Sequence, residues 1–316
     1  MSNLFEVVVA KRTDVTGVIS VFELAKPDGT PLPPYTAGAH IDVQVADGIV
    51  RQYSLLGDPK DRDRYLIAVL RETNSRGGSK GMHEWVFARN MIHISEPRNH
   101  FELDHSADHY VLVGGGIGIT PILAMARTLQ ADMKSFELHY CAKSRTGAAF
   151  LDVLAESSFS DRVHTYFDDE NQKLDPAGFA RYSGAQVYVC GPAGFMDWVS
   201  ETAIAAGALP DNVRREYFAA APKATVDNDS FEVTIQSTGQ SFLIPPDKSV
   251  ARVLEDAGVE ILLSCEQGIC GSCITNILEG VPDHRDSVLT ETERQSNTIF
   301  TPCCSRAKTK RLVLDL

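Results

Sequence analysis

The cysteines of this chain constrain its fold more than any other feature of the sequence. Five of the seven lie at or beyond position 265. Cys265, Cys270 and Cys273 follow the spacing Cys-x4-Cys-x2-Cys, and Cys303 comes after a further 29 residues. Three closely spaced thiolates and one distant thiolate are typical of the plant-type [2Fe-2S] centre, in which each iron takes two cysteine sulfurs beside the bridging sulfides. The sequence therefore predicts an iron-sulfur loop near its C-terminus, with these four residues as metal ligands.

Two alternatives concern the metal and the fourth ligand. Four cysteines could instead hold zinc, but structural zinc sites usually draw on two well-separated pairs of closely spaced ligands. Here the second half of the set is only Cys303 and its immediate neighbour Cys304. Adjacent side chains point in different directions, so we expect one of the two to be spare, and the spacing favours Cys303 as the ligand.

Length and charge limit the class of protein. With 316 residues the chain exceeds one typical domain, so two or three domains are expected. Its formal net charge of −12 is the wrong sign for a chain that grips nucleic acid or anionic lipid through a basic surface. The N-terminus lacks a secretory apolar region, and the uncharged stretch 111–126 is too short and too rich in glycine to span a membrane. We therefore expect a cytoplasmic protein with reduced cysteines and with no nucleic acid or membrane partner.

The first third of the chain reads as a β-structure. Apolar and polar residues alternate over 41–45 and again over 49–53, on either side of Asp47-Gly48, which is the pattern of a β-hairpin. We expect further strands at 5–12, 18–24, 65–71 and 91–96, and one short helix at 79–87. Such a series of short strands predicts a small antiparallel β-barrel over residues 1–105.

The middle of the chain has a different sequence pattern, in which apolar strands alternate with helices. Strands are expected at 110–113, 136–141, 162–167 and 185–190, and helices at 120–130, 150–155 and 193–206. This alternation predicts an α/β domain with a parallel sheet over residues 106–225. Residues 219–229 have the composition of a linker. A new alternation begins at 231–235 and a second strand is expected at 241–244, so residues 226–316 are expected to form a third domain.

The cysteine-rich region carries a family resemblance. Segments 264–273 (Ser-Cys-Glu-Gln-Gly-Ile-Cys-Gly-Ser-Cys), 282–286 (Pro-Asp-His-Arg-Asp) and 303–307 (Cys-Cys-Ser-Arg-Ala) resemble the ferredoxin end of the phthalate dioxygenase reductase family. The likeness extends over the whole chain in domain order. It implies a multidomain fold: an antiparallel β-barrel flavin domain, an α/β parallel-sheet nicotinamide domain and a C-terminal α+β plant-type ferredoxin domain of the β-grasp type. It also implies FMN, NADH and a [2Fe-2S] cluster as cofactors.

Two segments of the expected barrel suit a flavin. Arg51 and Tyr53 stand at alternate positions of one strand and so share a face, where an aromatic ring can pack on the flavin and a cation can meet phosphate. Residues 76–80, Arg-Gly-Gly-Ser-Lys, lead into a helix start that suits a phosphate. Together the segments resemble the flavin-binding pair of the ferredoxin reductase superfamily. The resemblance implies that the flavin ring and ribityl chain are held by Arg51, Tyr53 and Ser54, and the phosphate by Gly78, Ser79 and Lys80.

A glycine-rich turn follows the first strand of the expected α/β domain. Its glycines would let the backbone approach a pyrophosphate at a helix start. Ile119 replaces the third glycine of the dinucleotide-binding motif G-x-G-x-x-G. Taken alone, this segment could therefore be a tight turn that binds no ligand. Residues 190–196, Cys-Gly-Pro-Ala-Gly-Phe-Met, end a later strand, as a site at the carboxyl edge of a parallel sheet requires. Both segments resemble the superfamily's nicotinamide motifs, which implies binding roles for Gly115, Gly116, Gly118, Thr120, Cys190, Gly191, Pro192, Phe195 and Met196.

The resemblance also implies three catalytic residues: Thr120 approaches the flavin, Cys190 lies near the nicotinamide, and Phe218 packs against the flavin ring. The alternatives are that Phe218 belongs to the core and that Cys190 is an inert buried thiol. The residues after strand 136–141 and the family resemblance indicate different nucleotides, NADPH and NADH. No acidic residue directly follows the expected strand 136–141 to bind a ribose 2′-hydroxyl, and Ser144 and Arg145 there could accept a 2′-phosphate. The family resemblance implies NADH.

The resemblance finally implies a function. The chain would pass electrons from NADH through FMN and the [2Fe-2S] cluster to a partner Rieske-type mono- or dioxygenase that acts on an aromatic acid or a similar small substrate. The alternatives are a stand-alone NAD(P)H diaphorase or flavin reductase, against which the intact cysteine spacing argues, and a non-enzymatic iron-sulfur redox sensor, against which the two nucleotide motifs argue. Residues 226–316 hold 14 acidic and 8 basic side chains, which predicts steering of this region onto a basic patch of its acceptor.

Overall fold

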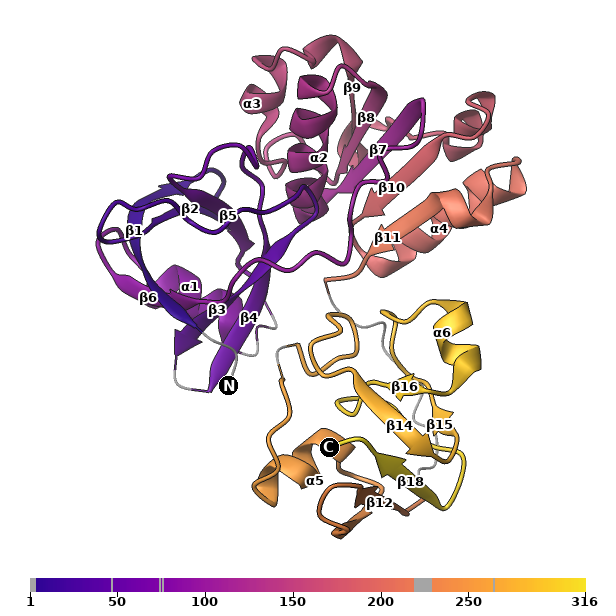
Figure 1. The fold of residues 1–316 in the computed structure, drawn as a ribbon. Coiled ribbons are helices and arrows are strands. Elements are labelled where there is room, and N and C mark those ends of the chain that lie inside the picture. Colours follow the sequence, from indigo (N-terminus) through magenta and orange to yellow (C-terminus); the bar gives the residue numbers. More distant parts are fainter. Residues whose placement is uncertain (1–3, 47, 74, 76, 219–228, 264) are drawn as a thin grey trace. The chain divides into compact units, whose positions relative to one another are not determined.

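The computed structural model describes residues 4–46, 48–73, 75, 77–218, 229–263 and 265–316, and the chain divides into two compact units. The larger unit ends at Phe218 and the smaller one contains the C-terminal region (Figure 1). The expected linker lies outside the described residues except for Asp229, and so do Asp47 of the hairpin, Arg76 and Ser264. Among the described residues, no helix combines the length and apolar character that crossing a membrane requires.

A six-stranded antiparallel sheet forms the first half of the larger unit. Its strand order is β4-β3-β6-β1-β2-β5, and an antiparallel bridge between Leu55 and Ile67 joins the two outer strands into a barrel. Alternate apolar side chains such as Val7 and Val9 fill the interior. The expected barrel is confirmed, and all six expected strands are present within two residues of their expected ends: β1 (Phe5–Asp14), β2 (Ile19–Ala25), β3 (His40–Ala46), β4 (Ile49–Ser54), β5 (Tyr65–Leu70) and β6 (Met91–Ile94).

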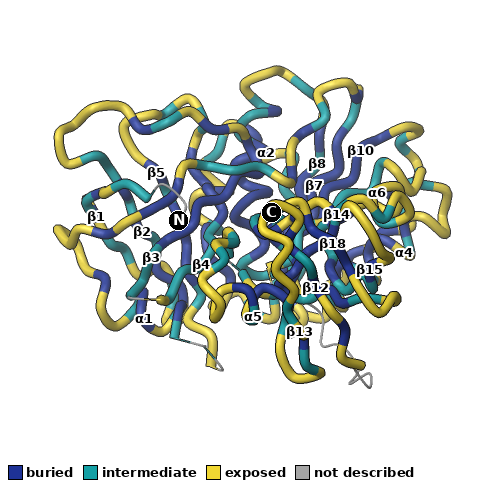
Figure 2. The backbone as a smooth tube through the Cα atoms, turned by 60° about the horizontal axis from the view of Figure 1, so that its bottom comes forward, coloured by how far each residue is buried: buried dark blue, intermediate teal, exposed yellow. Residues whose placement is uncertain are grey.

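The second half of the larger unit is a five-stranded parallel sheet of order β11-β10-β7-β8-β9. Alternate residues of the central strands are buried on opposite faces, with Leu112 toward α2 and Val111 and Val113 toward α4. Figure 2 shows β7 and β10 as buried along most of their length. Burial on both faces explains why these strands read as continuous apolar runs. The elements are β7 (His109–Gly115), α2 (Ile119–Ala131), β8 (Ser135–Ala142), α3 (Leu151–Ala155), β9 (Val163–Phe167), β10 (Gln186–Cys190), α4 (Ala193–Ala205) and β11 (Val213–Glu216).

Strand β11 was not expected from the sequence. Its residues, Val-Arg-Arg-Glu, show no apolar run, because it is an edge strand that pairs only with β10 among the described strands. Its position matters for the site, since it places Glu216 directly beside Cys190 in the register of the sheet.

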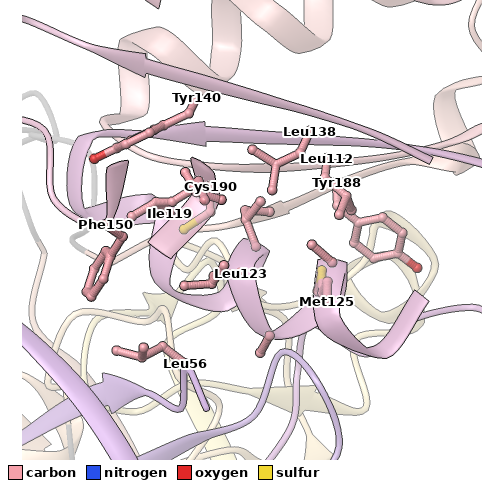
Figure 3. Packing of buried hydrophobic residues seen from close by; sticks show 14 of the residues in the cluster. Leu56, Leu112, Ile119, Leu123, Met125, Leu138, Tyr140, Phe150, Tyr188 and Cys190 are labelled. Carbon is pink, nitrogen blue, oxygen red and sulfur yellow. The ribbon is translucent and has the colours of Figure 1, made fainter. Parts of the chain in front are cut away.

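Helix α2 lies between the sheet and the barrel. Its side chains Ile119, Leu123 and Met125 pack against Leu112 of the sheet on one side and against Leu56 of the barrel on the other (Figure 3). Arg127, on the same helix, donates a hydrogen bond to the Leu56 carbonyl oxygen. The two halves therefore share one hydrophobic core, which holds the carboxyl edge of the parallel sheet against the barrel.

The smaller unit contains a five-stranded mixed sheet of order β13-β12-β18-β14-β16, in which β12 and β18 run parallel. Helix α5 covers the sheet through Val250 and Leu254, which pack with Val233 and Leu312. This arrangement confirms the expected β-grasp layout, although only its first two strands were expected individually. The elements are β12 (Phe231–Ile235), β13 (Ser241–Ile244), α5 (Val250–Asp256), β14 (Thr275–Glu279), β15 (Pro282–Asp283), α6 (Glu291–Ser296), β16 (Ile299–Phe300), β17 (Arg306–Ala307) and β18 (Arg311–Leu314).

Candidate functional site

The four predicted ligand cysteines all lie in the smaller unit. Three of them stand in the loop between α5 and β14, and Cys303 follows β16. Cys265 hydrogen bonds with Cys270, and Cys303 hydrogen bonds with both Cys273 and Cys304. Each iron of a [2Fe-2S] cluster takes two thiolates, so pairs of neighbouring thiols fit the cluster. Among the described residues, no group of three or more His, Cys, Asp or Glu side chains is placed to hold a single metal ion.

The loop also offers the hydrogen bonds that thiolate ligands need. The backbone N–H of Gln267 donates to Cys265 Sγ at 3.3 Å, and that of Ser272 donates to Cys270 Sγ at 3.5 Å. The pKa of Cys270 is lowered, chiefly because its sulfur accepts a hydrogen bond from the Cys265 thiol. The thiolate is the form of cysteine that binds metal.

Cys304, the neighbour of Cys303, lies beside different residues. It hydrogen bonds with Cys303, but its sulfur lies 3.3 Å from Thr301 Oγ1 and above Gly268. A Cβ atom on Gly268 would stand 2.3 Å from Cys304 Sγ and 2.9 Å from the Cα of Asp286, and this glycine has a φ of +73°. Glycine is therefore required where the loop passes Cys304, and Cys304 acts as a packing residue behind the loop.

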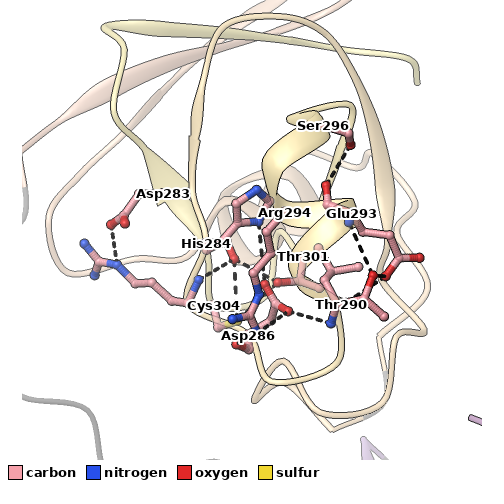
Figure 4. Close-up of polar contacts among 12 residues, drawn as sticks. Asp283, His284, Asp286, Thr290, Glu293, Arg294, Ser296, Thr301 and Cys304 are labelled. Atoms are coloured by element: carbon pink, nitrogen blue, oxygen red, sulfur yellow. Dashed lines mark hydrogen bonds and ion pairs between the residues drawn. The ribbon is translucent and has the colours of Figure 1, made fainter. Parts of the chain in front are cut away.

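A buried polar cluster supports the loop from behind (Figure 4). The backbone N–H of Ser287 donates to the Gly268 carbonyl oxygen at 2.8 Å. Asp286, whose side chain is fully buried, accepts from the Leu289 N–H at 2.9 Å and pairs with Arg294 at 3.5 Å. Helix α6, which carries Arg294, begins with a capping box formed by Thr290 and Glu293. Segment 282–286, which carried part of the family resemblance, is thus tied to the cysteine loop.

The predicted flavin phosphate site is assembled at the start of helix α1 (Gly78–Trp85). A Cβ atom on Gly78 would lie 2.3 Å from Arg51 Cγ, so the missing side chain lets Arg51 of β4 pass across the helix start. Gly77 stands at the N-cap with a φ of 89° and contributes no side-chain cap. Ser79 Oγ accepts from the Glu72 N–H, and the exposed Lys80 pairs loosely with Glu84 at 4.0 Å. The Lys80 N–H in the first turn donates to Ser75 Oγ at 3.2 Å, and the cation of Arg51 beside this helix start suits an anionic phosphate.

Tyr53 carries an unsatisfied polar atom at this site. Its hydroxyl is buried and has no hydrogen-bond partner within the part of the chain that the structure describes. Burial raises the pKa of this hydroxyl, so it remains protonated and able to donate. Buried hydroxyls nearly always find a partner, and the polar edge or ribityl chain of a flavin would provide one here. Ser54, the next residue, is buried as well. The residues present therefore fit FMN.

The two nucleotide motifs meet backbone to backbone at the carboxyl edge of the parallel sheet. A Cβ atom on Gly118 would lie 2.3 Å from the Cys190 carbonyl oxygen, and one on Gly191 would lie 3.0 Å from the Gly115 Cα. A Cβ atom on Gly115 would press on the ring of Phe195 at 2.8 Å and on Pro192. These glycines are required by the close approach, and they line the edge where a pyrophosphate would lie.

The remaining predicted residues of this edge have distinct places. Gly116 has a φ of +56° with open space above it. Thr120 is buried in the first turn of α2, and its hydroxyl donates to the Ile117 carbonyl oxygen at 3.0 Å. Met196 is fully buried among Val199 and other core residues, so it supports α4 from beneath.

Cys190 faces a carboxyl group that the sequence analysis did not assign a role. Its Sγ lies 4.0 Å from Glu216 Oε2, across the register pair of β10 and β11. Burial raises the pKa of Glu216 to about 8 and raises that of Cys190 well above its usual value, so both groups hold their protons at neutral pH. A buried, unreactive thiol at Cys190 matches one alternative from the sequence. Phe218, two residues beyond Glu216, is 41% exposed, so the alternative that it is a core residue is wrong.

The raised pKa of Glu216 predicts a pH dependence of stability. The folded chain keeps this proton up to about pH 8, whereas the unfolded chain releases it near the ordinary value of 4.5. The protein should therefore lose stability as the pH rises between these values, by on the order of 1–3 kcal/mol. Glu216→Gln, which mimics the protonated carboxyl group, should remove that loss. Thermal unfolding of both FMN-loaded proteins at several pH values measures the effect, and parallel curves would contradict it.

Ser144 and Arg145, which could accept a 2′-phosphate, lie after β8, and both already make hydrogen bonds within the protein. Ser144 Oγ accepts from the Gly147 N–H at 3.1 Å. Arg145 pairs with Glu170, donating from Nε and Nη2 to the two carboxylate oxygens at 3.0 Å each. Glu170 follows β9 and had no role in the sequence analysis, because only the adjacency of β8 and β9 brings it to Arg145.

Comparisons with known proteins agree with this geometry. The family model of the 2Fe-2S iron-sulfur cluster binding domain matches residues 233–308. The chain is 48% identical over 317 residues to a vanillate O-demethylase oxidoreductase of Pseudomonas sp. (strain HR199 / DSM 7063), a match that covers 99% of this chain and 100% of that protein. The solved structure of a phthalate dioxygenase reductase is similar at 39% identity and a TM-score of 0.75, over 99% of this chain and 98% of that one. An intact type IV self-sufficient cytochrome P450 monooxygenase is similar at 37% identity and a TM-score of 0.90, and there this chain covers only 41% of the other protein.

Proposed function

This chain belongs to the phthalate dioxygenase reductase family, and from that premise we propose that its electron acceptor is the Rieske-type oxygenase of a system that demethylates a methoxylated aromatic acid. The chain is an oxidoreductase, the reductase component of an oxygenase system, in which electrons pass from NADH through FMN and a [2Fe-2S] cluster to the oxygenase. The proposal concerns what the family leaves open: the type of oxygenase and its substrate. The observation that carries it is the near full-length similarity to vanillate O-demethylase oxidoreductase.

We assign the parts of the chain as the sequence analysis divided them. Residues 1–105 bind FMN, with Arg51 crossing the α1 start toward the phosphate and the Tyr53 hydroxyl donating to the flavin. Residues 106–225 bind NADH along the edge where Gly115, Gly118 and Gly191 meet. Residues 226–316 hold the cluster on the four paired cysteines. The support is the unsatisfied Tyr53 hydroxyl, the glycine contacts and the thiol pairing.

Cys190 and Glu216, at the carboxyl edge of the parallel sheet, do not carry electrons; as neutral groups they keep a nucleophilic thiolate and a carboxylate charge away from the nicotinamide. Cys190 is fully buried, and its raised pKa keeps it a thiol instead of a nucleophilic thiolate. The neighbouring Glu216 holds its proton to about pH 8, so the edge brings no carboxylate charge close to the expected nicotinamide position at neutral pH. Exposed Phe218 offers an aromatic face for the flavin ring.

The test uses the purified chain loaded with FMN and iron, NADH, vanillate and the oxygenase component of a Pseudomonas vanillate O-demethylase. We expect NADH consumption to be coupled to formation of formaldehyde and the demethylated acid. Absence of cluster reoxidation by this oxygenase, together with rapid reduction of a cytochrome P450 haem, would overturn the proposal in favour of a haem acceptor. Steady NADH oxidation that reduces only free flavin would instead support the stand-alone flavin reductase.

Charge predicts a salt effect on that turnover. The C-terminal region has six more acidic than basic side chains, counted over residues 226–316, and would meet a basic patch on the oxygenase. Raising the salt from about 0.05 M to about 0.5 M should slow turnover with the oxygenase by roughly threefold or more, because screening weakens the attraction between the partners. Reduction of a neutral quinone by the same protein is the control and should change little. A salt-independent rate with the oxygenase would contradict electrostatic steering.

A cytoplasmic location is part of the proposal. The cluster is built on thiols that must stay reduced until iron is inserted, and NADH is an intracellular reductant. Labelling of the expressed chain in fractionated cells tests this point.

A further inference from the structure

Arg145 stands where the sequence analysis placed a 2′-phosphate group, but its guanidinium is occupied. Both Nε and Nη2 donate at 3.0 Å to the two carboxylate oxygens of Glu170. This is the two-point geometry that an arginine would otherwise offer to a phosphate. The guanidinium carbon also lies 4.3 Å from the centre of the Phe167 ring at the end of β9, within reach of a cation–π interaction. Arg145 is thus oriented by its neighbours rather than free to swing.

The charges around Arg145 also disfavour a bound 2′-phosphate. Glu170 is the last residue of a single helical turn, Asp168–Glu170, whose three residues are all acidic. This turn is fastened to the end of β8, because the Asp169 N–H donates to the Lys143 carbonyl oxygen at 3.1 Å. The carboxylates of Glu170 and Asp169 both act on the Arg145 guanidinium and raise its pKa. A 2′-phosphate, which carries close to two negative charges, would have to displace Glu170 and lie beside the acidic turn.

A 2′-hydroxyl meets no such obstacle. It is neutral and can donate a hydrogen bond to a carboxylate, which is the role of the acidic residue that dinucleotide sites usually carry after the strand at this position. The sequence lacks that residue directly after β8. The register of β8 and β9, in which Ala142 pairs with Phe167, brings an acidic residue to the same edge from the next strand.

From this geometry we propose that Glu170 determines the preference for NADH, because it occupies the guanidinium of Arg145 and places negative charge where a 2′-phosphate would bind. This inference rests on the proposed placement of the dinucleotide at the carboxyl edge of the parallel sheet. It makes Glu170 a specificity-determining residue and Arg145 a phosphate-binding residue that its partner holds inactive.

The experiment compares the FMN-loaded chain with Glu170→Gln, which removes the charge and keeps the size of the side chain. We expect kcat/KM for NADPH, with ferricyanide as acceptor, to rise by about tenfold or more, while kcat/KM for NADH changes by less than about threefold. Binding of 2′,5′-ADP, measured by calorimetry, should tighten by a similar factor, and binding of 5′-AMP should not. The gain should be lost in the double variant Glu170→Gln with Arg145→Ala, because Arg145 would be the group that binds the phosphate.

Glu156→Gln is the matched control, since Glu156 is an exposed residue at the end of α3 and its loss changes the net charge by the same amount. It should leave the NADPH to NADH ratio unchanged. An unchanged ratio and unchanged 2′,5′-ADP binding in Glu170→Gln, with NADH oxidation intact, would overturn the inference. Failure of the parent protein to oxidise NADH at all would instead count against the proposed function, so the two failures are distinguishable.

Discussion

Replacement of Cys270 by serine should lower electron transfer to the oxygenase by at least about 100-fold, while NADH-driven reduction of ferricyanide by the flavin continues at close to the parental rate. Cys270 is buried, pairs with Cys265 and has the lowered pKa that a thiolate ligand needs. A serine hydroxyl is a poor ligand for iron, so the cluster should be lost or become unstable. Visible absorption of the cluster and the two acceptor assays on the same preparation measure the result.

The matched control is Cys304→Ser. Cys304 lies next to the fourth ligand, but its sulfur lies near Thr301 rather than pairing with the cysteines of the loop. This variant should keep both the cluster and the transfer to the oxygenase. If Cys270→Ser lost the cluster and still reduced the oxygenase, the electron path through the cluster would be wrong. If Cys304→Ser lost the cluster as well, the choice of Cys303 as fourth ligand would need revision.

Gly118→Ala should produce the largest loss in the use of NADH. The added Cβ would stand 2.3 Å from the Cys190 carbonyl oxygen and 2.6 Å from the Gly191 nitrogen, both backbone atoms that no side-chain rotation can move away. The two nucleotide motifs would have to separate, and kcat/KM for NADH should fall by at least about 100-fold. Overpacking of this kind also destabilises the fold by about 1–3 kcal/mol. Steady-state kinetics with ferricyanide and a thermal unfolding curve record the two effects.

Gly194→Ala is the control for this variant. Gly194 stands in the first turn of α4, close in sequence to the same motif, and a Cβ there would meet no atom within 4 Å. Alanine should leave NADH use intact and raise stability slightly, because it is the better helix former by about 0.5–1 kcal/mol. Normal NADH kinetics in Gly118→Ala would show that the close approach of the two motifs does not shape the nucleotide site.

The sequence predicted the fold well where a residue pattern has a local cause. In 5–12 the buried Val7 and Val9 stand between more exposed neighbours because one face of this barrel strand points inward, and 110–113 is continuously apolar because a central parallel strand is buried on both faces. Patterns of this kind identified the barrel, the parallel sheet and their helices. The pattern failed for β11, whose two arginines conceal an edge strand, and for most of the smaller unit, where strands of two to five residues are too short to show a period.

The residues of the candidate site also fall into two groups, those that the sequence pattern predicted and those that only the structure revealed. Cys265, Cys270 and Cys273 were predicted because a cluster loop needs its ligands at a fixed spacing along the chain, and Gly115 and Gly118 because a close approach allows no side chain there. Glu216 and Glu170 were missed as site residues. Each reaches its partner only through strand adjacency, Glu216 through the pairing of β11 with β10 and Glu170 through the pairing of β9 with β8.

The sequence by itself determined the domain order, the cofactor class and the ligand spacing, because these depend on residues near one another in the chain. Only the tertiary structure decided the two protonation and charge states that distinguish this site. Burial beside Cys190 raises the pKa of the Glu216 carboxyl group, and Glu170 engages the guanidinium of Arg145 in an ion pair. Both effects arise from distances between residues 25 or 26 positions apart, and the sequence specifies such distances only once the strands are paired.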